Sequence, residues 1–324
     1  MEVLYLTEAD VERLLTMEVA LEAVEAAFRA CAAGQIQNHP RRRLRASAGA
    51  WLNYMAANDD RSGYFGMKLY TVSSLGTAFL VPLYRADTGE MVALLEADCL
   101  GRVRTGAASG VATKYMARPD ATRVAIIGSG HQAPTQLEAI ARVRRLESAC
   151  VYSPNPGRRR GFAERMTAQL GLRVEPAASA EEAVRSADIV AVVTSTLTPA
   201  VRGAWLRPGT HVNAAGANFP RRRELEDDVL ARAARIVVDS REQARMEAGD
   251  LLQPFQENPQ RWEEVRELSE VVAGTAPSRG APEEITLFKS LGVALEDVAV
   301  AARVYERART EGLGRKLRMW DGGV

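Results

Sequence analysis

Residues 123–133 read RVAIIGSGHQA, and this stretch decides the fold. A short apolar run leads into Gly128, Gly130 and Ala133, which have the spacing of a dinucleotide-binding turn between a strand and a helix. The first glycine of such a turn adopts a backbone angle that a β-carbon disfavours, and the second lets backbone amides approach a pyrophosphate. The phosphates then lie at the N-terminus of the helix, where unpaired N–H groups favour negative charge.

The sequence around this turn favours nucleotide binding over an ordinary strand-to-helix turn, which glycines alone do not exclude. Downstream, Leu137, Ile140 and Val143 recur at helical intervals. Farther along, helical patterns separate apolar runs that lack alternation: ACVYS, LRVEPA, ADIVAVVTS, HVNAAGA and ARIVVDS. Strands of this kind are buried on both faces of a parallel sheet. The predicted fold class is therefore α/β, with a Rossmann-type doubly wound parallel sheet.

The sequence before Pro119 predicts a different domain of the α+β class. Thr7 and Thr16 each begin a helical pattern, and residues 41–97 are strand-like and include a β-hairpin. After Gly292, a long amphipathic helix is predicted to return to this first domain. We therefore predict a discontinuous domain made of residues 1–119 and 300–324, and a dinucleotide-binding domain made of residues 120–299.

Composition excludes several classes of function. The chain has 324 residues, 26% of them charged, and a formal net charge of +1, which gives no overall attraction to nucleic acid or to a membrane surface. The cysteines are few and far apart, which argues against a disulfide framework and a zinc ribbon and favours a reducing cytoplasm. His39 and His211 have no neighbouring ligand at metal-binding spacing, so no metal is expected. The N-terminus does not resemble a signal peptide.

The end of the second nucleotide-domain strand bears on the choice of dinucleotide. An NAD site usually places an acidic residue there to bind the ribose hydroxyls. This chain instead has Ser153 and Asn155, followed by Arg158, and these groups can meet a 2′-phosphate. The arginines of this segment can equally form a solvated helix face. The sequence therefore favours NADP(H) slightly over NAD(H) and leaves both open.

Further motifs extend across the chain in one order. They are HPRRR at 39–43, MKL at 67–69, GRVRTGAAS at 101–109, GSGHQA at 128–133, VNAAGAN at 212–218, REL at 223–225, VVDS at 237–240, GD at 249–250 and TLFKSLGVALED at 286–297. Together they resemble the ornithine cyclodeaminase/mu-crystallin family over nearly the whole chain. The resemblance implies hydride transfer between a nicotinamide and the α-carbon of an amino or imino acid, and a homodimer built through the non-nucleotide domain.

The resemblance also implies roles for residues of the first domain. Arg42 and Arg104 match the family arginines that hold the substrate carboxylate, for which a guanidinium fork is well suited. Arg41 and Arg43 remain rivals to Arg42 within the triple run. Lys68 matches the lysine beside the reacting carbon and nitrogen, and burial would lower its pKa into the range useful for proton transfer. A lysine that snorkels from an edge strand is the alternative. Met55 is expected to line the substrate pocket.

The expected dinucleotide contacts come from the glycine turn and from other strand ends. His131 is expected to shape the turn or to touch phosphate rather than to act in catalysis. The predicted cofactor-binding residues are Thr105, Gly128, Gly130, His131, Gln132, Ala133, Ser153, Asn155, Arg158, Thr194, Ser195 and Ser290.

Asn218 is the informative departure from the family pattern. The resemblance places an aspartate there in the cyclodeaminases and in alanine dehydrogenase, where it handles the substrate amine or a water. An amide orients such groups by hydrogen bonding but accepts no proton. We therefore predict an NAD(P)H-dependent imine reductase or an alanine-dehydrogenase-like enzyme, with Asn218 orienting the nitrogen or a water. The alternatives are an ammonia-forming ornithine cyclodeaminase and a non-catalytic, NADPH-dependent binding protein of the mu-crystallin type.

Overall fold

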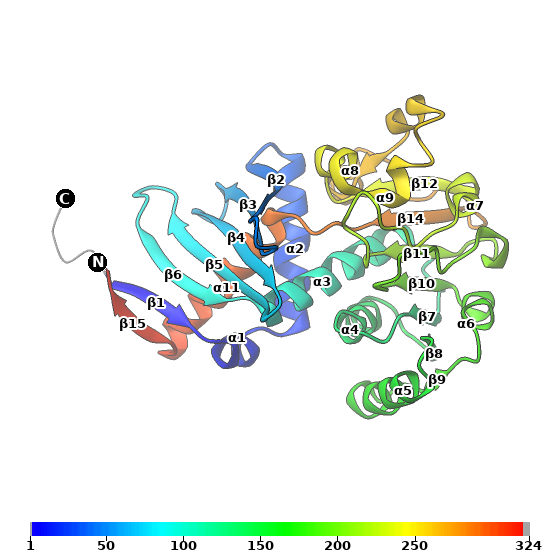
Figure 1. The fold of residues 1–324 in the computed structure, drawn as a ribbon, viewed down its shortest axis with the longest axis horizontal. Helices are drawn as coiled ribbons and strands as arrows, with labels where there is room; N and C mark the ends of the chain where they lie inside the picture. The colour runs from blue at the N-terminus through cyan, green and yellow to red at the C-terminus, as the bar shows by residue number, and fades with distance from the viewer. Residues whose placement is uncertain (1, 320–324) are drawn as a thin grey trace. The chain divides into compact units, whose positions relative to one another are not determined.

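The computed structural model describes residues 2–319. The chain forms two compact units, one made of Met1–Arg104 with Val293–Val324 and one made of Thr105–Gly292 (Figure 1). The first division falls inside helix α3 (Asp98–Met116) rather than at the predicted Pro119. The C-terminal part of α3 belongs to the second unit because Gly106 packs directly on Thr135, where a β-carbon would lie 2.5 Å from the carbonyl oxygen. The second division falls at Val293 rather than near residue 299.

The Thr105–Gly292 unit contains one parallel sheet of eight strands, in the order β13-β12-β14-β11-β10-β7-β8-β9. From β7 the chain winds outward through β8 and β9 on one side and through β10 and β11 on the other, and β14 returns to lie between β11 and β12. This is a doubly wound arrangement, and the predicted fold class is confirmed. The strands are β7 (Arg123–Ile127), β8 (Ser148–Tyr152), β9 (Val174–Pro176), β10 (Ile189–Val192), β11 (His211–Ala214), β12 (Ala233–Val238), β13 (Arg266–Glu267) and β14 (Ile285–Lys289).

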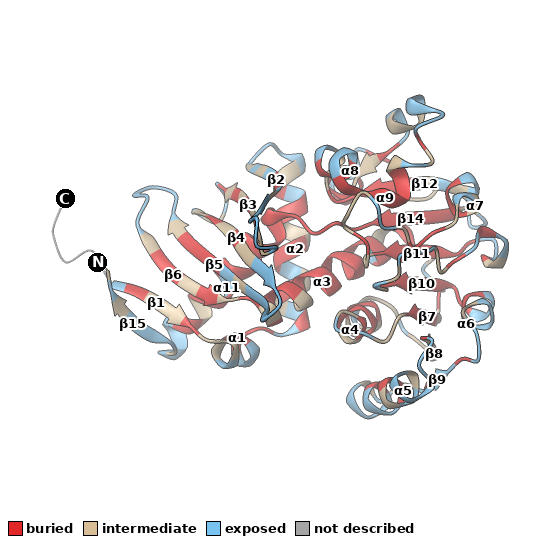
Figure 2. Cartoon of the chain, viewed as in Figure 1, coloured by how far each residue is buried: buried red, intermediate tan, exposed pale blue. Residues whose placement is uncertain are grey.

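Helices cover both faces of this sheet. Alternate residues of β7 enter opposite cores, with Ala125 and Ile127 on one side and Val124 and Ile126 on the other. The strands therefore lack polar alternation, and Figure 2 shows β10, β11 and β14 as buried. The helices are α4 (Ala133–Val143), α5 (Pro156–Leu170), α6 (Ala180–Ser186), α7 (Asp227–Arg232), α8 (Arg241–Glu247), α9 (Gly249–Leu252) and α10 (Leu268–Val272), with short 3-10 turns η1 (Gly203–Trp205) and η2 (Pro259–Glu263).

The other unit contains a seven-stranded sheet in the order β15-β1-β6-β5-β4-β3-β2. Neighbours from β2 to β6 are antiparallel, whereas β1 and β6 are parallel. The strands are β1 (Glu2–Leu6), β2 (Ile36–Arg45), β3 (Trp51–Asp59), β4 (Tyr64–Ser73), β5 (Gly76–Arg85), β6 (Met91–Glu96) and β15 (Arg315–Arg318). The helices are α1 (Glu8–Leu14), α2 (Met17–Ala32) and α11 (Ala294–Glu311). Thr7 and Thr16 cap α1 and α2, as their sequence positions predict.

Helix α11 is the centre of this unit. It packs on β2, β3, β4 and β5 and also on α2. Its residues from Ala294 to Ala302 are all buried, so the first half of the helix has no solvent face, in contrast to the predicted amphipathic pattern. Alanines and valines let the helix fit between the sheet and α2 at close range. The acidic pair Glu296 and Asp297 lies within this buried half.

Candidate active site

Four side chains of the first unit meet on the face of the sheet that α11 covers. Lys68 on β4 lies in register with Met55 on β3, and both are buried. The Lys68 ammonium donates to Oδ1 of Asp297 over 2.9 Å. Arg104 on α3 donates from Nε to the same oxygen over 3.0 Å. The structure therefore brings together Lys68, Met55 and Arg104, which the sequence singled out separately.

Arg104 is held by two carboxylates. In addition to Asp297, its Nη1 donates to Oε2 of Glu296 over 2.7 Å, and the guanidinium is only 5% exposed. The carboxylate pair raises the pKa of Arg104 against the cost of its burial. Because Nε and Nη1 lie on different edges of the guanidinium, each edge already has one donor engaged, and the grip left for a ligand is narrower than that of a free guanidinium fork.

The arginines that follow one another on β2 differ in their burial and in the face of the sheet on which they lie. Arg42 is exposed and pairs with Tyr54, which lies on the opposite face of the sheet from Met55. Arg41 is buried instead, with Nη2 3.7 Å from the sulfur of Met55. A register irregularity between His39 and Arg42 turns Arg41 inward. The arginine that joins the Lys68 cluster is therefore Arg41 rather than Arg42.

Burial lowers the pKa of Lys68 to about 8. Its exposed fraction is 3%, and loss of hydration disfavours the ammonium form. Asp297 opposes this change, while Arg104 and Arg41 add to it. A lysine in this state exchanges a proton near neutral pH.

The N-terminal turn of α4 and the loop before it have the features of a pyrophosphate site. Gly128 has φ of 106° and lies so close to Val193 that a β-carbon would be 2.5 Å from its carbonyl oxygen. A β-carbon on Gly130, in contrast, would meet nothing within 4 Å, so this side of the loop is open to a ligand. Helix α4 begins without a side-chain cap and without an acidic residue in its first turn. Its N–H groups can therefore bind an anion.

The other predicted cofactor residues also belong to the Thr105–Gly292 unit, and most of them follow the carboxyl ends of its parallel strands. Ser153, after β8, shares a hydrogen bond of 2.9 Å with Ser129 of the glycine loop. Asn155 caps α5 by accepting from the N–H of Arg158, whose side chain is exposed. The carboxyl ends of parallel strands share one edge of a sheet. The remaining predicted residues lie in the glycine loop (His131, Gln132), at the start of α4 (Ala133), after β10 (Thr194, Ser195), after β14 (Ser290) and in α3 (Thr105).

Sequence reasoning missed the buried carboxylate that fixes the ends of β10 and β11. Glu224 accepts hydrogen bonds from the backbone and hydroxyl of Thr194 and from the backbone N–H groups of Gly216 and Ala217. A β-carbon on Gly216 would lie 2.4 Å from the Glu224 carboxylate. Burial raises the pKa of Glu224. Asn218 follows directly on the segment that Glu224 holds.

A second buried pair supports Glu224. Asp250 accepts from the N–H of Glu224 and forms an ion pair of 2.9 Å with Lys289 at the end of β14. All three side chains have no exposed surface. The motifs REL, GD and TLFKS contain these residues, so the signal was present in the sequence, but only tertiary contact reveals that the three motifs meet.

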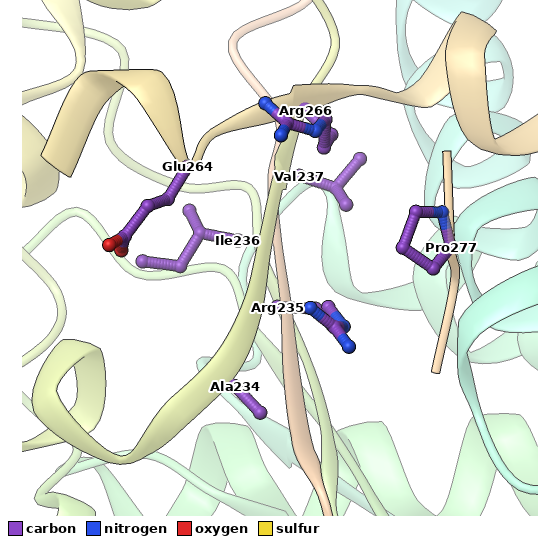
Figure 3. Close-up of a pocket in the computed structure, with 7 residues that line it drawn as sticks. All are labelled: Ala234, Arg235, Ile236, Val237, Glu264, Arg266 and Pro277. Atoms are coloured by element: carbon purple, nitrogen blue, oxygen red, sulfur yellow. The ribbon is translucent and has the colours of Figure 1, made fainter. Parts of the chain in front are cut away.

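A pocket of about 430 Å³ lies elsewhere, at the edge of the parallel sheet formed by β12 and β13. Figure 3 shows Arg235, Arg266 and Pro277 among its lining residues. None of the predicted site residues lines it. Within residues 2–319, no three His, Cys, Asp or Glu side chains are grouped to hold a metal ion. The helices of the same residues include none long and apolar enough to cross a membrane.

The sequence and the fold of this chain are similar to those of known enzymes. Delta(1)-pyrroline-2-carboxylate reductase of Bacillus cereus shares 40% identity over 239 residues, which cover 74% of this chain and 73% of that protein. Alanine dehydrogenase of Archaeoglobus fulgidus shares 36% identity, with 99% of each chain covered. The structure of Thermococcus litoralis Delta(1)-pyrroline-2-carboxylate reductase in complex with NADH and L-proline superposes with a TM-score of 0.93 at 36% identity, covering 97% of this chain and 100% of the other.

The family-level comparison covers almost the entire sequence. A sequence model of the ornithine cyclodeaminase/mu-crystallin family matches residues 1–312, which include the whole Thr105–Gly292 unit, most of the other unit and every predicted site residue. The resemblance drawn from the motifs is therefore confirmed. This chain belongs to the ornithine cyclodeaminase/mu-crystallin family.

Proposed function

We propose that this protein is an NAD(P)H-dependent oxidoreductase that reduces the C=N bond of a small α-imino acid or oxidises the corresponding α-amino acid. The observation that carries the proposal is the buried cluster around Lys68. It contains three cations, Lys68, Arg104 and Arg41, and two carboxylates, Glu296 and Asp297. Three cations at one buried site favour the binding of a substrate carboxylate, because guanidinium and ammonium groups donate charge-assisted hydrogen bonds to its oxygens.

Each residue of the cluster has a separate role in such a reaction. Nη2 of Arg104, with Arg41 nearby, binds the substrate carboxylate. Lys68 gives one proton to the imine nitrogen as the C=N bond becomes a C–N bond. Met55 supplies an apolar wall beside the lysine. When bound, the dinucleotide supplies the hydride that adds to the α-carbon and is itself oxidised. In the oxidative direction Lys68 takes the proton back.

Asn218 supports reduction over cyclodeamination. Loss of ammonia from ornithine needs a group that accepts and returns protons at the substrate nitrogen, and an amide cannot do this. Reduction needs the hydride, one proton donor and a grip on the carboxylate. Asn218 then orients the nitrogen or a water by hydrogen bonding.

For the cofactor we propose a preference for NADP(H) over NAD(H). The segment after β8 carries no carboxylate that would repel a 2′-phosphate, and the Arg158 side chain is exposed at the start of α5. The neighbouring Arg159 is already engaged with the carbonyl of Ser153. We expect Arg158→Ala to weaken NADPH binding about tenfold, through loss of one charge-assisted contact, and to leave NADH binding unchanged. Equal effects on both dinucleotides would contradict the preference.

We also propose that the chain acts as a cytoplasmic homodimer. A solved structure of an archaeal alanine dehydrogenase with a TM-score of 0.92 is described as a dimer with bound NAD. In this chain, Leu44, Leu52 and Leu80 are exposed on the sheet face opposite Lys68. An apolar sheet face of this kind favours association with a second copy.

The proposed function is tested by measuring three quantities separately: oxidation of the dinucleotide, formation of proline or alanine, and release of ammonia. The purified protein is incubated with NADPH or NADH and with pyrroline-2-carboxylate, or with pyruvate and ammonium. We expect net oxidation of the dinucleotide together with formation of proline or alanine. Production of proline and ammonia from ornithine without net cofactor turnover would establish the cyclodeaminase instead. Tight dinucleotide binding without turnover of any of these substrates would favour the binding protein.

A further inference from the structure

One carboxylate oxygen in the first unit accepts hydrogen bonds from both Lys68 and Arg104. Oδ1 of Asp297 lies 2.9 Å from Nζ of Lys68 and 3.0 Å from Nε of Arg104. Asp297 has no exposed surface, and its Oδ2 has no hydrogen-bond partner among residues 2–319. A buried carboxylate is costly unless cations compensate it, so the two bonds to Oδ1 determine where each cation lies.

The surroundings leave the Lys68 ammonium little freedom. Its Nζ lies 5.2 Å from the ring centre of Phe79 on β5. A β-carbon at Gly101 of α3 would lie 2.6 Å from Nζ, so only glycine admits the ammonium at this distance. Asp297 lies in the first turn of α11, where the helix dipole favours a negative charge.

From this geometry we propose that Asp297 is a positioning residue, which fixes the proton donor Lys68 and the carboxylate-binding Arg104 relative to each other through one shared oxygen. The substrate's carboxylate and nitrogen are separated by a single carbon, so the two cations must be spaced to match. Asp297 itself need not touch the substrate. The catalytic consequence rests on the proposed function, whereas the effect on Lys68 does not.

Glu296 provides a matched comparison within the same helix turn. It is equally buried and carries the same charge, and it accepts a hydrogen bond from Nη1 of Arg104, whereas the Lys68 ammonium donates to Asp297. If Asp297 were only one of two interchangeable counter-charges, neutralising either residue would have the same effect. If Asp297 positions Lys68, only its neutralisation changes the titration of that lysine.

The charged groups that face Lys68 come from three elements. Asp297 on α11 favours the ammonium form, whereas Arg104 on α3 and Arg41 on β2 disfavour it. The Phe79 ring on β5 is uncharged. Removal of the Asp297 charge therefore leaves two cations and burial acting together, and the pKa of Lys68 must fall below its value in the parent protein.

The chain itself offers a direct readout, because it has few lysines among many arginines. Protein labelled with carbon-13 at lysine Cε gives a nuclear magnetic resonance titration of each one, and loss of a signal in Lys68→Met assigns the residue of interest. We expect Asp297→Asn to move the Lys68 titration down by on the order of one pH unit and Glu296→Gln to leave it nearly in place. The lysines are Lys68, Lys114, Lys289 and Lys316.

A second variant disturbs the contact without changing any charge. Gly101→Ala places a methyl group where the ammonium lies, and alanine is a better helix former than glycine, so α3 is expected to fold. Because the ammonium is then displaced from Asp297, the pKa of Lys68 should again fall. If Asp297→Asn does not fold, this variant decides the question. An unchanged Lys68 titration in a folded Asp297→Asn or Gly101→Ala protein overturns the proposal.

Kinetics then separate positioning from general structural damage. In the reductive direction, Lys68 acts as the ammonium, so the alkaline limb of kcat/KM should move to lower pH in Asp297→Asn by the same amount as the titration. Glu296→Gln should raise KM and leave that limb in place. A shifted titration without any imine reduction would contradict the proposed function while leaving the positioning of Lys68 supported.

Discussion

At the scale of single residues, the account depends most on the protonation of Lys68. With a pKa near 8, the lysine is largely ammonium at neutral pH and loses its proton as pH rises through that value. Reduction needs the ammonium, so kcat/KM for an imino acid should be level below the pKa and fall tenfold per pH unit well above it. In Lys68→Met, turnover should fall on the order of 100-fold or more. Dinucleotide affinity should be retained, because the predicted cofactor residues lie in the other unit; parent-like turnover would remove Lys68 from the mechanism.

A second prediction at this scale concerns Asn218. Asn218→Asp introduces a group that can manage protons at the substrate nitrogen without altering side-chain size. We expect the parent to reduce imino acids without converting ornithine, and the variant to gain measurable ammonia release from ornithine. The assay follows ammonia, proline and NAD(P)H separately. Robust conversion of ornithine by the parent would show that an amide suffices and that this position does not separate the activities.

At the level of single residues, the structure adds contacts that the sequence motifs do not contain. Lys68 and Arg104, which come from separate motifs, both donate to one carboxylate oxygen of Asp297, a contact that neither motif predicts. The sequence favours Arg42 for substrate binding and leaves Arg41 and Arg43 as rivals. A register irregularity between His39 and Arg42 turns Arg41 toward Met55, which no local pattern shows. Asp297 is the last residue of the TLFKSLGVALED motif, but the sequence did not single it out as a site residue, because its partners lie at separations of 193 and 229 positions in the chain.

At the scale of elements, the glycine loop before α4 carries the cofactor prediction. Gly130→Val fits the folded protein, since nothing lies within 4 Å of the added β-carbon, but it fills the space into which a pyrophosphate must come. We expect the affinity for NAD(P)H to fall at least tenfold, about 1.4 kcal/mol, with little change in the melting temperature. Isothermal titration calorimetry and thermal unfolding measure the two effects. Undiminished affinity in the folded variant would mean that this loop does not bind the dinucleotide.

The elements themselves were largely predictable because each carries its own local pattern. Caps at Thr7 and Thr16 and the apolar runs of the parallel sheet gave most helices and strands. Strands β1 and β15 escaped prediction because the two ends of the chain pair with each other. Strand β14 was noted only as part of a motif, and its lysine at Lys289 is buried by an ion pair with Asp250 that no local pattern shows.

At the scale of the whole molecule, the exposed leucines on the first unit predict how copies associate. Leu52→Glu and Leu80→Glu place charges on the sheet face that we propose as the dimer interface, and burial of an unpaired charge should dissociate the dimer. Light scattering after size-exclusion chromatography should give a monomer mass. Leu197→Glu is the matched control, since this leucine is 72% exposed but lies in the other unit. A dimer that survives both sheet substitutions would place the interface elsewhere.

The domain organisation was predictable in kind but not at its boundaries. A return of the last helix to the first unit follows from the sequence pattern, whereas the division within α3 does not. Proline at 119 ends the helix, but the helix changes unit earlier because Gly106 allows close packing on α4. Local breakers mark where elements end, and only tertiary packing decides to which unit an element belongs.

The central claim is that hydride passes between the nicotinamide and the α-carbon of an imino or amino acid. It is tested most directly with dinucleotide that carries deuterium at the transferable position of C4, incubated with pyrroline-2-carboxylate or with pyruvate and ammonium. The account predicts one deuterium at the α-carbon of the proline or alanine formed for each dinucleotide oxidised, as measured by mass spectrometry. Product without deuterium at the α-carbon, or no oxidation of the dinucleotide with either substrate, would contradict it.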